Sequence, residues 1–167
     1  MIKMVDVTYY WTAYDFSYWN NPGNMTDGST RTFADATIQF TQQLNTTNTC
    51  NGTNLGTITK VEIRAYGYVD SPFTPIKIFL FICLGGICLD EYVWRSLPAP
   101  AWSEYFDITF AGIAPTPWTW NDIRSLGVVV MSGSEFYSAV YCGRVEVRVT
   151  YTPPVSVAGK GLVSWTP

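Results

Sequence analysis

Apolar and polar residues alternate along several short stretches of this chain. In residues 144–151, Val145, Val147 and Val149 point to one side, and charged residues and a threonine point to the other. A repeat of two residues is typical of a strand with one buried face. Residues 58–68 show the same pattern, which predicts a second strand of this kind.

Further stretches carry strand signals, and turn-forming residues separate them about every 8–12 residues. The expected strands are residues 1–10, 36–44, 58–68, 76–84, 87–94, 105–110, 127–131, 136–142 and 144–151. Phe106, Ile108 and Phe110 are expected to face the core, and residues 121–126 to form one helical turn capped by Asn121. Many short strands without a long helix predict an all-β fold, a two-sheet antiparallel jelly-roll-like β-sandwich with an extended C-terminal arm.

The cysteines add a crosslink to this picture. Two glycines at 85–86 form a two-residue hairpin turn, which places Cys83 opposite Cys88. Their Cα atoms are then about 4.5–5.5 Å apart, within the range of a disulfide. We expect a Cys83–Cys88 disulfide, with two buried thiols as the alternative. Cys50 and Cys142 are candidates for a second disulfide.

The composition excludes several classes of partner. The net charge is −3, and the ten lysines and arginines are scattered singly, so no nucleic-acid partner is expected. No apolar run reaches the roughly 18 residues of a spanning helix, so no membrane insertion is expected. Charged residues make up only 14% of the chain. The surface must then be rich in threonine, serine, asparagine and tyrosine, which is common on extracellular and virion proteins and favours close subunit packing.

Catalytic and metal-binding patterns are missing from the sequence. Asp90 and Glu91 point to opposite faces of a strand, and so do Glu104 and Asp107, so neither pair converges for acid–base chemistry. There is no histidine, no second close cysteine pair and no glycine-rich loop ahead of a helix. We expect no enzyme, no cofactor and no metal site built on cysteine or histidine.

The end of the chain extends past the last expected strand. Pro153 and Pro154 remove two hydrogen-bond donors, which ends a domain over residues 1–152 and leaves residues 153–167 as an arm. The arm alternates again, and its odd-numbered face carries Val155, Val157, Gly159, Gly161, Val163 and Trp165. We expect this face to join the open sheet edge of an identical subunit. The alternatives are a strand folded back on its own sheet and a disordered terminus.

Two short segments resemble a known family. Residues 27–33, DGSTRTF, are similar to the D-G-x-x-x-T-aromatic element of discoidin-like (galactose-binding-like) sandwiches, and residues 55–63, LGTITKVEI, to the L-G…I-x-x-V-x-I strand of that family. The resemblance covers about residues 20–65. It implies a jelly roll whose members often bind glycans at loops, sometimes with a calcium ion beside the D-G turn. Asn24 and Asp27 would then be calcium ligands; the alternative is a turn closed by the Asp27 side chain.

Two functions follow from these patterns. The first is a structural subunit that self-assembles with identical subunits into an extracellular filament or a virion, partly by strand addition through the arm. The alternative is a carbohydrate-binding module or fibre-tip adhesin with surface glycans as partners. Its platform would be the tryptophans at loop-like positions, Trp11, Trp19, Trp102, Trp118 and Trp120.

The expected location is outside the cell or in a virion. Residues 1–6 show neither an apolar core nor a cleavage site, so no signal peptide is visible. Asn24, Asn45 and Asn51 stand in glycosylation acceptor triplets. Residues 11–19, which are dense in aromatic side chains, form either a surface recognition patch or a loop pinned over one end of the sandwich.

Overall fold

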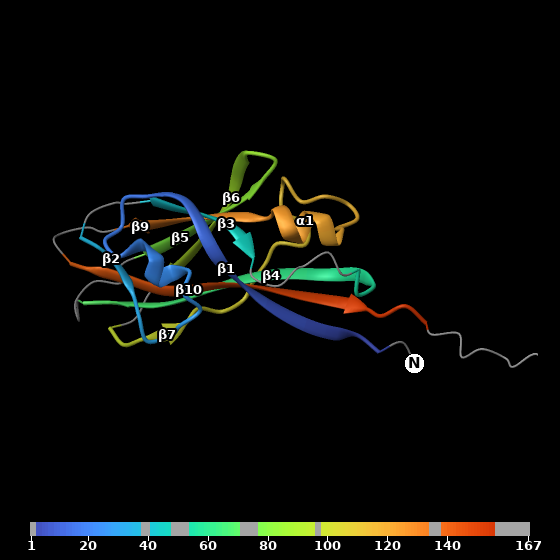
Figure 1. Cartoon of the computed structure of the whole chain (residues 1–167), viewed down its shortest axis with the longest axis horizontal. Helices are drawn as coiled ribbons and strands as arrows, with labels where there is room; N and C mark the ends of the chain where they lie inside the picture. Colours follow the sequence, from blue (N-terminus) through green and yellow to red (C-terminus); the bar gives the residue numbers. More distant parts are fainter. Residues whose placement is uncertain are drawn as a thin grey trace, which may run out of the picture.

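The computed structural model describes residues 3–37, 41–47, 54–70, 77–95, 98–133 and 138–155, with the backbone alone for 41–47. They form a two-layered β-sandwich of the predicted jelly-roll-like kind (Figure 1). The elements are β1 (Val5–Ser17), η1 (Pro22–Met25), β2 (Ala34–Ala36), β3 (Thr41–Thr47), β4 (Thr57–Val69), β5 (Lys77–Leu84), β6 (Ile87–Arg95), β7 (Ala101–Trp102), β8 (Phe106–Asp107), α1 (Trp120–Ser125), β9 (Gly127–Gly133) and β10 (Val140–Thr152).

The two sheets share one strand. In sheet A, the first half of β1 pairs with β10, β10 with β4, and the short strands β2, β7 and β8 add to these two. In sheet B, the second half of β1 pairs with β3, followed by β9, β5 and β6. All these pairs are antiparallel. Figure 1 shows β1 crossing from the upper layer to the lower one.

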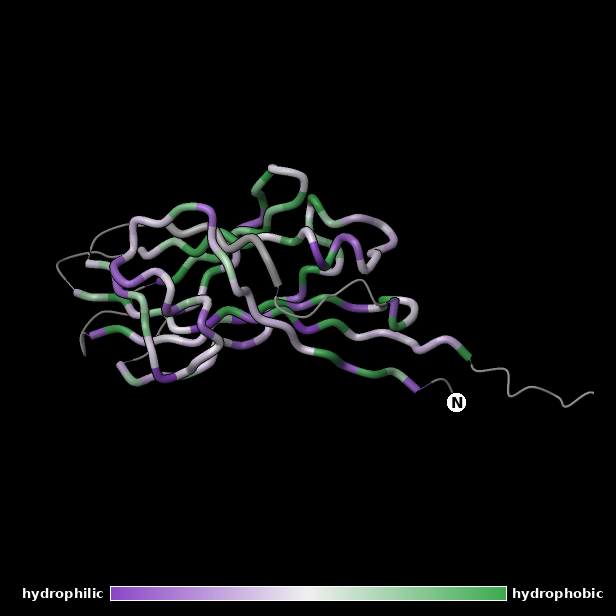
Figure 2. The backbone as a smooth tube through the Cα atoms, viewed as in Figure 1, coloured by the Kyte–Doolittle hydropathy of each residue, from purple (hydrophilic) through white to green (hydrophobic). Residues whose placement is uncertain are grey.

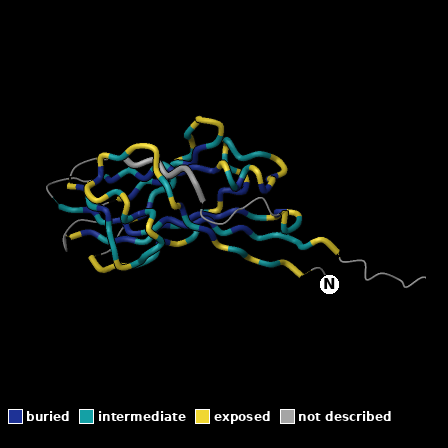
Figure 3. The backbone as a smooth tube through the Cα atoms, viewed as in Figure 1, coloured by how far each residue is buried: buried dark blue, intermediate teal, exposed yellow. Residues whose placement is uncertain are grey.

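The core lies between the sheets and is built from the alternating residues. Val145, Val147 and Val149 of β10 are buried and sit beside Val61 and Ile63 of β4, as the period of two predicts. Figure 3 shows the buried residues running through the centres of both layers, and Figure 2 shows hydrophobic residues along the same strands. Each buried valine contributes about 1.5–3 kcal/mol, so these two strands are a main source of stability.

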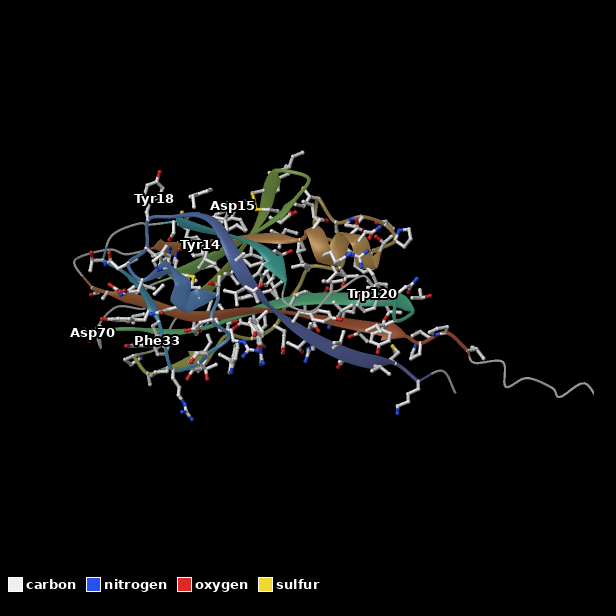
Figure 4. The ribbon with its side chains drawn as sticks, in the orientation of Figure 1. Tyr14, Asp15, Tyr18, Phe33, Asp70 and Trp120 are labelled. Atoms are coloured by element: carbon white, nitrogen blue, oxygen red, sulfur yellow. A yellow bond between two sulfur atoms is a disulfide. The ribbon has the colours of Figure 1, made fainter. Side chains whose placement is uncertain are left out.

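The aromatic stretch after Tyr10 is part of β1 and is not a loop. Trp11 is fully buried, and its Nε1 donates to the Leu126 carbonyl at 2.9 Å. Trp19 is buried as well and donates to the Val130 carbonyl. The prediction of a loop was wrong because the irregular register between β1 and β3 conceals the alternation. Tyr14 of this strand and Tyr18, which follows its end, are exposed (Figure 4).

Two local predictions also need correction. Strand β8 holds only Phe106 and Asp107, and the chain turns at once, so Phe110 lies on the surface with 87% of its area exposed. The N-cap of α1 is Thr119 and not Asn121. Thr119 and Asp122 form a capping box, in which each side chain bonds the backbone of the other. In the part of the chain that the structure describes, no helix has the length and apolar character needed to cross a membrane.

The hairpin prediction holds. Strands β5 and β6 pair across the two-glycine turn, and a disulfide joins Cys83 and Cys88 with a Cα–Cα distance of 4.0 Å. Cys142 is a buried free thiol in β10, whereas Cys50 lies outside the described residues, as does the arm after Val155. The division into residues 1–152 and an arm of residues 153–167 therefore stays a prediction.

Candidate functional site

The described hollows of the surface gather at one end of the sandwich. Three adjoining hollows of about 350, 540 and 180 Å³ are lined by residues from 54–59, 109–124 and 152–155. They share residues with one another, so they form one depression, which we call the end groove. The label of Trp120 in Figure 4 marks this end, where β4 begins and α1 packs above it.

Two tryptophans hold the wall of the end groove in place. The Nε1 atom of Trp120 donates to the Gly56 carbonyl at 2.7 Å, and the Nε1 atom of Trp118 donates to the Thr109 carbonyl at 2.9 Å. The Trp120 ring also meets the Tyr151 ring edge-on, with centroids 5.4 Å apart. These bonds tie the first residue of α1 to the segment before β4, and the loop before α1 to the turn after β8. The groove is therefore a preformed feature.

Gly56 lets the floor of the groove pass close to the end of β10. Its φ is +139°, and a Cβ at this position would lie 2.0 Å from the Thr152 carbonyl oxygen. Only glycine fits such a backbone approach. The glycine of the L-G element is therefore required by backbone packing at the groove. The carbonyl of Gly56 also accepts a hydrogen bond from the Trp120 indole N–H.

The polar lining of the groove consists of amides, hydroxyls and one guanidinium. Asn54, Thr57, Thr119 and Asn121 line the hollow of about 350 Å³ together with Arg124. Nη2 of Arg124 donates to the Asn121 side-chain oxygen, while its Nη1 is buried without a hydrogen-bond partner among the described residues. A buried donor of this kind is satisfied when an acceptor from a ligand reaches it.

The described lining contains no carboxylate. Asp122 of α1 is engaged in the capping box with Thr119, a residue of the lining. Among the described residues, no group of three or more carboxylates and cysteines converges as a metal site. The groove offers hydrogen bonds and aromatic surface, and its described residues lack the paired carboxylates of acid–base catalysis.

The aromatic surface of the groove includes a residue that the sequence pattern assigned to the core. Phe110 lines the hollow of about 180 Å³ beside Pro117 and Trp118, and it is the most exposed aromatic side chain among the large hydrophobic residues found at the surface. The proline-rich context of residues 111–117 was the available signal that the strand had already ended.

The five predicted platform tryptophans are distributed over three environments. Trp11 and Trp19 belong to the core and cannot stack on a ligand, which corrects their assignment. Trp118 and Trp120 line the end groove but are 6% and 5% exposed, so they form its wall more than an open platform. Trp102 is half-buried on the outer face of sheet A.

The candidate calcium ligands are engaged in protein hydrogen bonds. The two carboxylate oxygens of Asp27 accept from the Ser29 N–H at 2.7 Å and the Thr32 hydroxyl at 2.5 Å. The Asn24 side-chain amide donates to the Phe33 carbonyl at 2.9 Å. The D-G element is a turn closed by its own aspartate. The assignment of Asn24 and Asp27 to calcium stays a prediction. The glycosylation triplets stay predictions, since the side chain of Asn45 and all of Asn51 lie outside the description.

Comparisons with known proteins found similar chains among solved structures. No family model and no curated protein matches the sequence. Among solved structures, the chain is similar to a truncated AlyQ with CBM32 and alginate lyase domains, at 12% identity and a TM-score of 0.46. That match covers 91% of this chain but 35% of the AlyQ chain.

Two further structures are single modules. The family 32 CBM from C. perfringens NanJ in complex with galactose has 10% identity and a TM-score of 0.40, covering 87% of this chain and 93% of the module. A structure described as CBM4 structure and function has 12% identity and a TM-score of 0.36, covering 89% and 92%. The resemblance to a discoidin-like jelly roll is thus found again among solved structures, although identities and TM-scores this low assign no residue a role.

The expectation of a self-assembling subunit is contradicted by these findings. The three structures named are, or contain, carbohydrate-binding modules, and none is a filament or virion subunit. Assembly with identical subunits through Val155, Val157, Gly159, Gly161, Val163 and Trp165 has no support. Val155 is exposed, and the other five residues lie outside the described part of the chain.

Proposed function

We propose that this protein binds carbohydrate at the end groove and has no catalytic activity of its own there. The observation that carries the proposal is the exposed Phe110 ring at the rim of a preformed groove lined by amides and hydroxyls. The surrounding described residues supply no carboxylate pair for bond cleavage.

The chemistry of this groove matches that of a sugar. One face of a pyranose ring presents C–H groups, which pack on an aromatic ring, while its hydroxyls both donate and accept hydrogen bonds. Phe110 offers the ring, and the side-chain amides of Asn54 and Asn121 offer hydrogen bonds. A volume of about 350 Å³ is at the lower end for small-molecule sites and suits a sugar unit at the end of a chain.

The disulfide supports a location outside the cytoplasm. Bonds such as Cys83–Cys88 persist in oxidising compartments and are rare in the cytosol. A carbohydrate-binding protein at a cell surface or in the extracellular space agrees with this chemistry.

A glycan array tests the proposal directly. We expect the protein to bind a restricted set of glycans, and Phe110→Ala to lose that binding at least tenfold by isothermal titration calorimetry. Phe16→Ala is the matched control, because Phe16 is an exposed phenylalanine on β1, outside the groove lining. Absence of any glycan binding, or equal binding by the Phe110 and Phe16 variants, would contradict the proposal.

A further inference from the structure

A second surface with recognition chemistry lies on the outer side of sheet A, away from the core. Half-buried aromatic side chains of three strands and two loop segments meet there over a layer of arginines. We call it the outer aromatic face, and it consists of Phe33, Tyr66, Tyr68, Trp102, Tyr105 and Tyr141 with Arg64, Arg144 and Arg148. Phe33, labelled in Figure 4, marks this lower side of the molecule.

The rings of the outer aromatic face form a continuous run. Tyr68 stacks on Tyr141 with centroids 4.4 Å apart, and Phe33 lies 5.1 Å from Tyr68 and 5.9 Å from Tyr66. Tyr66 in turn lies 5.0 Å from Trp102. Each step joins residues on neighbouring strands or on the segment before β2, so the run follows β4.

Guanidinium groups extend this run toward the other end of β4. The Arg64 guanidinium lies 3.9 Å from the centroid of Trp102 and 4.4 Å from that of Tyr105. The Arg148 guanidinium lies 3.6 Å from the Tyr105 ring. Contact of a planar cation with two rings fixes the orientation of all three groups. Along β4, positions 62–68 cover about 20 Å at about 3.3 Å per residue.

The charges of this face are already paired. Glu146 bridges Arg64 and Arg144, and Glu62 bridges Arg148 and Lys60, with N–O distances of 2.7–2.8 Å. Lys60 also lies 3.8 Å from Asp107. Four cations thus face three carboxylates, and a surplus of one positive charge is too small to attract a polyanion such as a nucleic acid.

The face is also rigidly supported from the D-G turn. Arg144 Nη1 donates to the Gly28 carbonyl at 2.7 Å, and its guanidinium lies 4.4 Å from the Tyr10 ring. A Cβ at Gly28 would lie 2.7 Å from the Tyr10 ring, so this glycine lets the turn lie on the face. Groups fixed in this way bind a ligand without a large loss of side-chain entropy.

We propose that the outer aromatic face binds a linear, uncharged polysaccharide chain lying along β4. An extended row of rings interleaved with paired guanidinium and carboxylate groups offers stacking surface and hydrogen bonds at successive sugar units. The proposal rests on the carbohydrate-binding function but concerns a different surface. The end groove would hold one sugar unit, and the outer aromatic face would hold several consecutive units.

Affinity electrophoresis in native gels that contain soluble polysaccharide tests this proposal. The probes are barley β-glucan, xyloglucan and galactomannan, with a polyuronate and a single-stranded oligonucleotide as charged comparisons. We expect a neutral polymer to retard the wild-type protein, and Trp102→Ala to weaken this binding at least fivefold. Trp102→Phe keeps an aromatic ring at this position and should retain most of the polysaccharide binding. Tyr14→Ala is the matched control on sheet B.

The outcomes separate this proposal from the proposed function. If Phe110→Ala loses glycan-array binding while Trp102→Ala leaves polymer binding unchanged, the outer aromatic face is not a binding surface and the end groove still is. Retardation by the polyuronate or the oligonucleotide alone, or by no polymer, also overturns the proposal. A Trp102→Ala protein that fails to fold by circular dichroism is replaced by Tyr105→Ala, whose residue lies in a loop, and the same fivefold loss is required.

Discussion

Glu146 is a carboxylate that the structure both buries and pairs. It lies on the outer aromatic face, yet its side chain is only 5% exposed, and it bridges Arg64 and Arg144. Arg64 donates to it through Nε and Nη2, at 2.9 and 2.8 Å. Replacement by alanine would leave two guanidinium groups on a half-buried surface without their shared acceptor.

The magnitude follows from the burial of the partners. Removal of one member of a fully buried ion pair costs about 3–5 kcal/mol, whereas an exposed pair contributes about 0–1 kcal/mol. The arginine side chains are 25% and 22% exposed, so water can partly solvate them after the change. We therefore expect Glu146→Ala to lower the free energy of unfolding by about 2–3 kcal/mol. For a chain of this size the Tm would fall by about 5–10 °C.

Urea titration and thermal scans at pH 7 measure this loss. Glu91→Ala is the control, because Glu91 is an exposed glutamate on β6, and its change should stay within about 0.5 kcal/mol. Glu146→Gln keeps the shape of the side chain and one acceptor oxygen. Its loss in free energy of unfolding should therefore lie between those of Glu146→Ala and Glu91→Ala. If Glu146→Ala costs no more than Glu91→Ala, the ion-pair layer does not stabilise the sheet and our account of the outer aromatic face is wrong.

Three further changes test other parts of the fold. Trp11→Phe removes the indole N–H that donates to the Leu126 carbonyl, and it should lower the free energy of unfolding by about 1–3 kcal/mol in urea titrations. A smaller decrease than that of the surface variant Tyr14→Phe would contradict this prediction. Gly56→Ala places a methyl group 2.0 Å from the Thr152 oxygen, so it should lower the Tm and abolish end-groove binding together, and an unchanged Tm would contradict this. Burial raises the pKa of the Cys142 thiol from 9.0 to about 12. The unfolded thiol then loses its proton first, so stability should fall as pH rises from about 9 toward 12; Cys142→Ala should reduce that slope between pH 7.5 and 10, and an unchanged slope would refute the assignment.

The strands could be predicted from the sequence to the extent that their alternation is regular. In β4 and β10 the inward valines and isoleucines repeat every second residue. The predicted ends of β4 differ from the observed ones by one residue, whereas β10 joins the predicted strand 144–151 to the end of the predicted strand 136–142. The hairpin and its disulfide follow from a two-glycine turn, whose geometry is local. In β1, irregular pairing with β3 interrupts the period of two, and the residues after Tyr10 were therefore taken for a loop.

The end groove could not be predicted in the same way, because its parts come from distant segments. Asn54 and Gly56, Phe110, and Pro153 are brought together only when β4, the loop after β8 and the end of β10 meet at one end of the sandwich. Aromatic composition indicated that tryptophans matter, but it does not say which rings are exposed. Burial depends on segments that are distant in the sequence, such as the end of α1, where Leu126 supplies the carbonyl that accepts the Trp11 indole N–H.

By itself, then, the sequence determined the all-β class, the Gly-Gly hairpin with its disulfide and the inward face of the regular strands. Each of these depends on backbone geometry within a few residues. Only the tertiary structure decided that Phe110 is exposed, that the D-G turn supports Arg144 and Tyr10, and that two glutamates are buried among arginines. Those features arise where separate strands pair and pack, and a pattern read along one strand carries no information on its neighbours.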